Sequence, residues 1–274
     1  MNEAPEFFIL RHDRPLPGSL NMAVDGHLLA SLGETPRTVL RFYQWERPTA
    51  SLGAGQTAAR VVDPEFCRAH GIDIVRRITG GKLVLHHQEV TYSVTSNDVA
   101  TFTDTLGGSY KRISQALVRG LEGMGLKAAL ADKAPPFYAK GTMPCFSLPA
   151  QDEIEIGGLK IVGSAQKRTG GRFLQHGSIP LAHDIELLRA VSLYKGEGGI
   201  RMTSLSRELG RDVDFDWAVE RLTAGFADFF GVSLLPLELG PSDWDAIRTL
   251  EAGKYANPAW TFEGRDAPEA ADPR

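Results

Sequence analysis

Residues 141–181, GTMPCFSLPAQDEIEIGGLKIVGSAQKRTGGRFLQHGSIPL, carry the clearest structural pattern in this chain of 274 residues. Two glycine pairs, Gly157-Gly158 and Gly170-Gly171, separate runs in which apolar residues alternate with polar ones. Two-residue glycine turns between such runs are the strongest short-range indication of a β-hairpin. We therefore predict a three-stranded antiparallel meander, with Cys145 in a proline-flanked loop at its entrance.

Strands and helices alternate before this meander, and helices dominate after it. Residues 38–45, 72–77 and 82–94 are rich in β-branched and aromatic residues and are predicted to be strands. Residues 103–126 carry apolar residues at helical spacing and are predicted to form an amphipathic helix. Further helices are expected after the N-cap candidates Ser19 and Asp63. Beyond the meander, helices are expected at residues 184–191, 203–209, 214–230 and 242–251.

This order of elements predicts an α+β fold, with a mixed or antiparallel sheet, flanking helices and a helical C-terminal extension. We expect residues 1–182 to form a catalytic domain and residues 183–263 to form a helical part packed on it. Residues 264–274 have the composition of a disordered tail.

Composition and charge argue against several classes of protein. A formal net charge of −4 gives no reason to expect binding to nucleic acid. No segment approaches the ~18–20 apolar residues of a membrane span, and the N-terminal residues lack the pattern of a signal peptide. The two cysteines, Cys67 and Cys145, are too far apart in the sequence for a zinc motif or a disulfide framework. We expect a cytoplasmic protein with no metal site.

Cys145 is the first candidate for catalysis. A buried cysteine usually packs as a small hydrophobic residue, and this is the interpretation we prefer for Cys67, which lies on the helix after Asp63. Cys145 differs because Pro144 and Pro149 indicate a loop, and loops held by a rigid scaffold often carry catalytic groups. A thiolate there would suit acyl transfer from a thioester.

The second candidate is the turn Arg77-Ile78-Thr79-Gly80-Gly81-Lys82, which follows a predicted strand. A glycine pair lets backbone N–H groups approach a ligand closely, so this turn is either an anion-binding or carbonyl-binding cradle or a plain hairpin with charged shoulders. The adjacent His86 and His87 point to opposite faces of a strand and cannot chelate one ion.

The third candidate is the strand that begins near Lys160. Alternation places Lys160, Ser164 and Gln166 on one face, where small neighbours could let a substrate lie along the strand. A lysine in such a position is more often a solvated charge at a sheet edge. His176, on the next strand, is equally ambiguous by itself.

Several of these motifs together resemble one family. Residues 21–25 (NMAVD), residues 76–81 (RRITGG), residues 85–94 (LHHQEVTYSV), residues 161–168 (IVGSAQKR) and residues 174–178 (LQHGS) occur in the order found in the lipoate–protein ligase and octanoyltransferase superfamily, which includes biotin–protein ligases. Cys145, ahead of the Lys160 motif, is similar to the nucleophile of the cysteine-dependent octanoyltransferases.

The resemblance implies an acyltransferase of lipoate biosynthesis that needs no cofactor. Cys145 would take octanoyl from octanoyl-acyl carrier protein and pass it to a lysine of a lipoyl domain or of glycine-cleavage H protein. Lys160 would lie near the acyl carbonyl, as a positive charge or as an aid to proton transfer. The resemblance further implies a substrate-binding set made of Arg77, Gly80, Gly81, His86, Ser164, Gln166 and His176.

Three alternatives stay open at this point. An ATP-dependent and Mg²⁺-dependent lipoate–protein ligase would use Arg76, Arg77 and the glycine turn to hold an adenylate phosphate. An amidotransferase would move octanoyl between two lipoyl-accepting proteins, also through a cysteine. A non-catalytic protein would only bind acylated partners, and it would have no need of Cys145 and Lys160 together.

Overall fold

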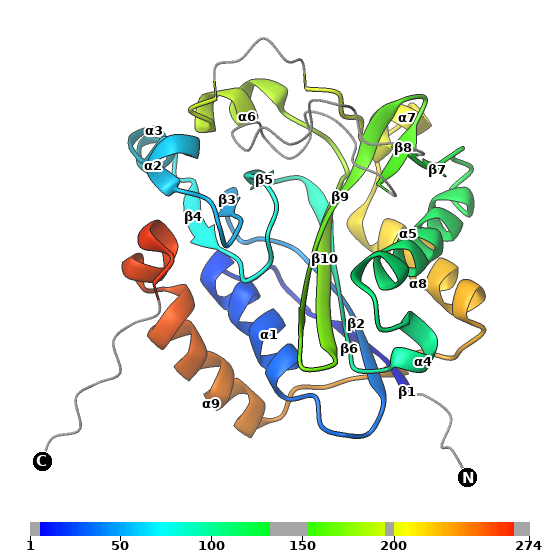
Figure 1. Cartoon of the computed structure of the whole chain (residues 1–274). Coiled ribbons are helices and arrows are strands. Elements are labelled where there is room, and N and C mark those ends of the chain that lie inside the picture. The colour runs from blue at the N-terminus through cyan, green and yellow to red at the C-terminus, as the bar shows by residue number, and fades with distance from the viewer. Residues whose placement is uncertain (1–5, 132–152, 195–199, 266–274) are drawn as a thin grey trace, which may run out of the picture.

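The computed structural model describes residues 6–131, 153–194 and 200–265. The predicted α+β class is confirmed: one large mixed sheet and one small sheet are flanked by helices (Figure 1). Cys145, the proline-rich residues before it and the tail beyond residue 265 lie outside the described residues.

The large sheet contains eight strands in the order β11-β1-β2-β6-β10-β9-β8-β7 within the described residues. β11, β1 and β2 run parallel to one another, and the other neighbouring pairs are antiparallel. The strands are β1 (Glu6–Arg11), β2 (Arg37–Tyr43), β6 (Glu89–Ser96), β7 (Ala129–Leu130), β8 (Ile154–Ile156), β9 (Leu159–Thr169), β10 (Arg172–Pro180) and β11 (Leu235–Pro236).

The small sheet has the order β4-β3-β5, with strands β3 (Thr49–Leu52), β4 (Asp73–Arg76) and β5 (Val84–His86). The predicted strand at residues 82–94 is therefore divided between two sheets. β5 pairs with β3, whereas β6 pairs with β2 and β10. The chain passes from one sheet to the other at His87 and Gln88, so the two sheets stay close together at this point.

The predicted meander is present as β8, β9 and β10. All four glycines of its two turns have positive φ, from 53° to 78°. This left-handed conformation is the one that type I′ hairpin turns require and that glycine adopts without strain.

Helices cover both faces of the large sheet (Figure 1). α1 (Gly18–Ala30) and α9 (Pro241–Leu250) lie on one side, and α5 (Leu106–Glu122) and α8 (Phe215–Phe230) lie on the other. The shorter helices are α2 (Ala58–Val61), α3 (Pro64–Ala69), α4 (Val99–Phe102), α6 (Ile185–Val191) and α7 (Leu205–Leu209), and two π-helical turns follow α9 at Glu251–Tyr255 and Ala259–Glu263.

Most helix starts follow the expected chemistry. Asp63, Asp184 and Asp214 each accept a backbone N–H from the first turn of the helix that follows. The prediction of Ser19 as an N-cap is wrong. α1 begins at Gly18, and the Ser19 hydroxyl donates to Glu251, which secures the start of α1 to the C-terminal part of the chain.

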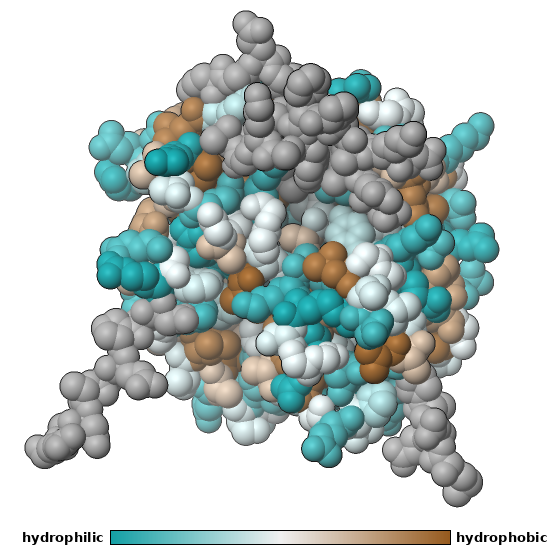
Figure 2. Space-filling view, viewed as in Figure 1, coloured by the Kyte–Doolittle hydropathy of each residue, from teal (hydrophilic) through white to brown (hydrophobic). Residues whose placement is uncertain are grey.

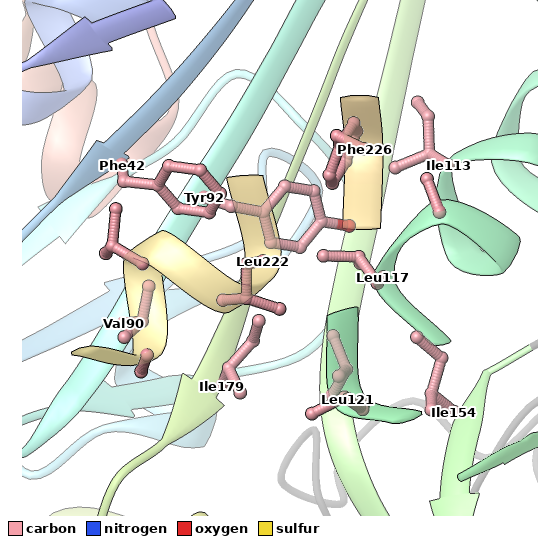
Figure 3. Packing of buried hydrophobic residues seen from close by; sticks show 14 of the residues in the cluster. Phe42, Val90, Tyr92, Ile113, Leu117, Leu121, Ile154, Ile179, Leu222 and Phe226 are labelled. Atoms are coloured by element: carbon pink, nitrogen blue, oxygen red, sulfur yellow. The ribbon is translucent and has the colours of Figure 1, made fainter. Parts of the chain in front are cut away.

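The largest apolar core fills the space between the sheet and the pair α5 and α8. Figure 3 shows Leu117 and Leu121 of α5 and Leu222 of α8 pointing toward the sheet residues Tyr92 and Ile179. The outer surface is different. On the face shown in Figure 2, hydrophobic residues form separate small spots among hydrophilic ones. Among the described residues, no helix is both long enough and apolar enough to cross a membrane.

Candidate active site

A narrow pocket lies between the small sheet and the α1 side of the large sheet. It contains about 40 Å³ of open space. By comparison, a cavity of about 150 Å³ holds benzene, so this pocket is small for a ligand with a long chain. Its lining residues are Met22, Tyr43, Trp45, Ser51, Arg77, Gly81, Lys82, Val84, His86, Thr91, Gly163, Ser164, Ala165, His176, Gly177 and Ser178.

The predicted glycine turn forms one wall of the pocket, and Arg77 supports it from inside. The Arg77 guanidinium donates to the carbonyl oxygens of Gly80 and Lys82, at 2.9 and 2.7 Å, and to the carbonyl oxygen of Ser51. Gly81 has φ 90°. Gly53 lies so close to it that a Cβ on Gly53 would be 2.2 Å from the Gly81 carbonyl oxygen, which explains the glycine at both positions.

The neighbouring Arg76 does not bond to the glycine turn; it bonds to the C-terminal part of the chain and to the loop at residues 53–56. Its buried guanidinium donates to the carbonyl oxygens of Trp260 and Thr261 and to three carbonyls of the loop at residues 53–56. The Trp260 indole N–H donates back to the Arg76 carbonyl. Arg76 thus joins the C-terminal part of the chain to the loop behind the glycine turn. In the ligase alternative the Arg76 guanidinium would bind a phosphate, but here it is bonded to backbone carbonyls.

Asp25 and His176 form the first of two buried carboxylate–histidine units at the pocket. His176 Nδ1 lies 3.1 Å from Asp25 Oδ2, and its Nε2 lies 2.6 Å from the Thr79 hydroxyl. Burial by itself raises the pKa of Asp25. Arg41 at 2.7 Å and His176 lower this pKa by more than burial raises it, so the net shift is downward. Burial lowers the pKa of His176. Tyr43 and Ser93 also donate to Asp25.

Glu89 and His86 form the second unit. His86 Nδ1 lies 2.7 Å from Glu89 Oε1, and its Nε2 lies 2.7 Å from the Ser51 hydroxyl. Thr91 and Ser178 donate to the same carboxylate. Burial opposes ionisation of Glu89, but His86 and the two hydroxyls more than compensate, and the pKa of Glu89 is lowered. Because His86 belongs to the small sheet and Glu89 to the large one, this contact joins the two sheets at the pocket.

Lys160, the predicted catalytic lysine, is fully buried at the start of β9. Its ammonium group donates to Glu153 Oε1 at 2.7 Å, and Glu153 is buried as well. The lysine is therefore not a solvated edge charge. It is not among the residues that line the pocket. Cys145, the predicted nucleophile, precedes Glu153 by eight residues and lies outside the described residues, so its role stays a prediction.

The face of β9 that carries Ser164 and Gln166 packs against the helices on the far side of the sheet. The Ser164 hydroxyl lies 2.8 Å from that of Tyr92, and Gln166 bonds to Ser109 of α5 and to Gln175. The pocket is lined by Gly163 and Ala165 and also by Ser164, although the Ser164 hydroxyl is bonded to Tyr92. The structure thus gives Gln166 polar partners in the interior and does not place it at the pocket.

Five members of the predicted binding set lie together at the pocket, namely Arg77, Gly81, His86, Ser164 and His176. Gly80 adjoins them in the turn, where its carbonyl accepts from Arg77. Gln166 and the catalytic candidate Lys160 lie elsewhere. Whether these residues bind substrate stays a prediction.

Four buried charged residues were missed as site residues by the sequence argument: Asp25, Arg41, Glu89 and Glu153. Asp25 could have been suspected, because it is the acidic residue of a mainly apolar helix. Arg41 takes its partners from α1, 16 and 20 positions away, whereas Glu89 and Glu153 bond to His86 and Lys160, only three and seven positions away, so these two carboxylates could have been suspected from their neighbours. Among the described residues, no group of three or more His, Cys, Asp or Glu side chains could hold a metal ion.

Comparison with known proteins identifies the family. Residues 17–227 match the lipoyl protein ligase A/B catalytic domain. The chain belongs to this family. The octanoyltransferase LipM of Kyrpidia tusciae is 38% identical over 269 residues, which cover 92% of this chain and 97% of that protein. The LipM of Symbiobacterium thermophilum is 37% identical, covering 90% and 94%. The family expected from the motifs is confirmed.

Solved structures show the same fold. A lipoate-protein ligase A bound with ATP has a TM-score of 0.81 at 23% identity and covers 95% of this chain and 100% of its own. A bipartite lipoate protein ligase from Thermoplasma acidophilum, studied with its E2 lipoyl domain, has a TM-score of 0.78 at 22% identity and covers 97% of this chain and 100% of its own. The mixed sheet with flanking helices is therefore the fold of this group.

Proposed function

We propose that this protein transfers an octanoyl group through a thioester on Cys145. The donor is octanoyl-acyl carrier protein, and the acceptor is a lysine of a lipoyl domain or of glycine-cleavage H protein. The observation that carries the proposal is the set of relatives named octanoyltransferase, which are 31–38% identical over most of this chain. Their names support octanoyl transfer in lipoate biosynthesis.

The proposed reaction has two steps. The Cys145 thiolate attacks the carbonyl carbon of the donor thioester, and the carrier-protein thiol leaves. The ε-amine of the acceptor lysine then attacks the carbonyl of the acyl-enzyme, an amide forms, and Cys145 is released as a thiol. Lys160, which forms an ion pair with Glu153 and does not line the pocket, is proposed to act at the Cys145 end of the acyl group, either as a positive charge at the carbonyl oxygen or as an aid to proton transfer. No nucleotide or metal takes part.

The pocket between the two sheets is the proposed site for the acyl group. Met22, Trp45 and Val84 supply apolar surface, and the glycine turn with His86 supplies a polar side. This mixture suits an acyl chain with a carbonyl at one end.

Intact-mass measurement after mixing the protein with octanoyl-loaded carrier protein tests the proposal. We expect one octanoyl adduct that is lost in Cys145→Ala and kept in Cys67→Ala. Cys67 is a matched control, because it is buried and burial raises its pKa to about 11, which leaves it a poor nucleophile. The absence of an adduct, or an adduct that survives Cys145→Ala, would overturn the proposal.

Further assays on the wild type and Cys145→Ala separate the alternatives. An ATP-dependent ligase would show lipoate-dependent pyrophosphate exchange that persists in Cys145→Ala. An amidotransferase would load Cys145 from an octanoylated lipoyl-accepting protein in preference to the carrier protein. Tight carrier-protein binding without any transfer would favour a simple binding protein.

A further inference from the structure

A second cavity lies apart from the pocket, between the end of β1, the start of α1 and α9. It is formed by residues 9–14, residues 16 and 20, and residues between 236 and 248, and we call it the β1–α9 groove. It contains about 810 Å³ of open space, within the range of about 300–1,000 Å³ that is usual for small-molecule sites. None of the described residues lines both the groove and the pocket. No step of the proposed octanoyl transfer uses this groove.

Part of the groove wall is apolar. Its apolar side chains include Leu10, Leu16, Leu20, Leu237, Leu239 and Trp244. All six pack in the core cluster between α1, α9 and the sheet, but Leu237, Leu239 and Trp244 are only partly buried. These three side chains therefore keep apolar surface in contact with water. An apolar group laid against them would be stabilised, because that surface would be removed from water.

His12 is the polar group of the groove whose ring hydrogen is located by its partner. Arg41 Nε donates to His12 Nε2 at 2.9 Å. A guanidinium can only donate, so Nε2 is the acceptor and the ring hydrogen is on Nδ1. Burial, followed by Arg41, lowers the pKa of His12 to about 3, so the ring is neutral at neutral pH. Nδ1 has no hydrogen-bond partner among the described residues and is not one of their buried unpartnered nitrogens, so this N–H is accessible in the groove.

The buried bonds of Arg41 keep His12 in this orientation. Arg41 donates to Asp25 Oδ1 at 2.7 Å and to the side-chain oxygen of Asn21 at 2.6 Å, and all three side chains are buried. The Trp244 ring also packs against the His12 ring, with centroids 6.2 Å apart and planes at 60°. A donor that is held in place before binding loses less conformational entropy when it meets an acceptor.

The cation bonded to His12 Nε2 determines which acceptor suits Nδ1. When one imidazole nitrogen binds a metal cation, the other N–H commonly donates to a carboxylate. Arg41 places a cation on Nε2 in a similar way, which polarises the ring and makes Nδ1–H a stronger donor. The Arg41–Asp25 pair acts on His12 as a net positive charge, because Arg41 lowers the pKa of His12 more than Asp25 raises it. A carboxylate at Nδ1 therefore gains more than an uncharged acceptor, and no carboxylate of the described residues bonds there.

The charges around the groove also favour an anion, by a small margin. Arg14 and Arg248 line it, are exposed and form no ion pair with another described residue. Arg11 lines it too, but is paired with an aspartate of α8. Asp13 and Glu238 are the carboxylates of the lining, and they oppose an anion. The lining thus carries three arginines and two carboxylates, in a protein whose net charge is −4.

We propose that the β1–α9 groove is a second ligand site, which binds a carboxylate with an apolar chain, the chemistry of a medium-chain fatty acid. The carboxylate accepts the hydrogen on His12 Nδ1 and lies between the arginines of the rim. The chain lies against the partly buried leucines and Trp244. Binding is reversible and makes no covalent bond. Decanoate is the probe, and decanol, which has the same chain without the charge, is its control.

The indole signals in nuclear magnetic resonance spectra locate the ligand, because the tryptophans occupy different places. Trp45 lines the pocket, Trp244 lines the groove, and Trp217 and Trp260 line neither. Decanoate is titrated into the full chain at neutral pH, with the four signals assigned from single Trp→Phe variants. We expect a saturable shift of the Trp244 signal, with an affinity about tenfold higher for decanoate than for decanol. An unchanged Trp244 signal, or a shift confined to Trp45, would overturn the inference.

Three substitutions test the groups that bind the carboxylate. His12→Phe removes the donor and should weaken decanoate binding about tenfold. Arg248→Gln should weaken it about two- to fivefold, and Glu238→Gln should strengthen it by a similar factor. Arg60→Gln on α2, which is exposed and lines neither cavity, is the matched control and should change nothing.

Equal affinities for decanoate and decanol, or equal losses in Arg248→Gln and Arg60→Gln, would also overturn the inference. If His12→Phe does not fold, the opposite effects of Arg248→Gln and Glu238→Gln decide. Failure of the wild type to form an acyl-enzyme would overturn the proposed function and leave this inference standing, because decanoate binding requires no transfer.

Discussion

All eight residues of strand β6 are buried, yet the two faces of the strand have different surroundings. Val90, Tyr92 and Val94 face the apolar core beneath α5 and α8. Thr91 and Ser93 face the other way, where their hydroxyls donate to Glu89 and Asp25. Alternation in a strand normally separates core from solvent. Here it separates an apolar core from a buried polar network beside a pocket.

The difference matters because the two faces fail in different ways. An apolar core loses transfer free energy and gains a cavity when one side chain is shortened, but its neighbours can relax. A buried network of charges cannot relax as easily, because removing one member leaves another charge without its partner. We therefore expect stability and activity to be separable on the α5 and α8 side and inseparable on the α1 side.

The largest effect is expected for Asp25→Asn. Arg41 would keep its buried charge but lose the carboxylate at 2.7 Å, so the free energy of unfolding should fall by about 3–5 kcal/mol, and acyl transfer should fall as well. Denaturant unfolding measures the first quantity. Asp216→Asn is the matched control, because the Arg11–Asp216 pair is exposed and should contribute about 0–1 kcal/mol. Equal losses in the two variants would refute the contrast.

Leu222→Ala on α8 should come next. Leu222 is fully buried against Gly120 of α5, so the free energy of unfolding should fall by about 3 kcal/mol. The folded variant should still transfer octanoyl at the wild-type rate, since the side chain lies on the face away from the pocket. Leu106→Ala, at a site that is 54% exposed, serves as the control and should change little. A loss of transfer in folded Leu222→Ala would contradict the separation of the two faces.

Acid sensitivity should come from the α1 side. Burial, followed by the nearby Arg41, lowers the pKa of His12 from 6.5 to about 3. Between these values the unfolded chain binds a proton that the folded protein does not, so stability decreases as the pH falls, by up to about 1.4 kcal/mol per unit. His12→Gln should flatten this slope in unfolding experiments, and the exposed His70→Gln should not. An unchanged slope in His12→Gln would count against the assignment.

Gln166→Ala should have the smallest effect. If Gln166 binds substrate, as the motif alone suggests, the KM for the donor should rise. From its bonds to Ser109 and Gln175, we expect instead a loss of about 1 kcal/mol in the free energy of unfolding and an unchanged KM. Steady-state kinetics beside an unfolding curve distinguishes the two outcomes.

The parts of the fold that the sequence predicted correctly depend on local chemistry. The glycine pairs at 157–158 and 170–171 set the meander, because few other residues accept their backbone angles. Asp63 shows its capping role within three residues of itself. The short strand β11 was missed, because two residues carry no periodicity and this strand forms only by pairing with β1.

Several residues of the site could be predicted from the sequence, but some of their hydrogen-bond partners could not. The glycine turn and both histidines could be located from the sequence, whereas the pairing of His176 with its carboxylate could not. Asp25 and His176 are 151 positions apart, and only the packing of α1 on the sheet brings them together. Ser19 shows the same limit, since a residue with ideal capping chemistry was recruited by Glu251 from 232 positions away.

The clamp formed by Arg76 has a consequence for the timing of folding. Arg76 bonds to the loop behind the glycine turn through Nη1, whereas its Nε donates to the carbonyl oxygens of Trp260 and Thr261. All the residues that line the pocket precede residue 179, so they leave the ribosome well before this support exists. A nascent chain can form β1, α1 and the meander early, but Arg76 then has unmet donors. We therefore expect the loop behind the pocket to reach its full stability only after residue 261 has been synthesised.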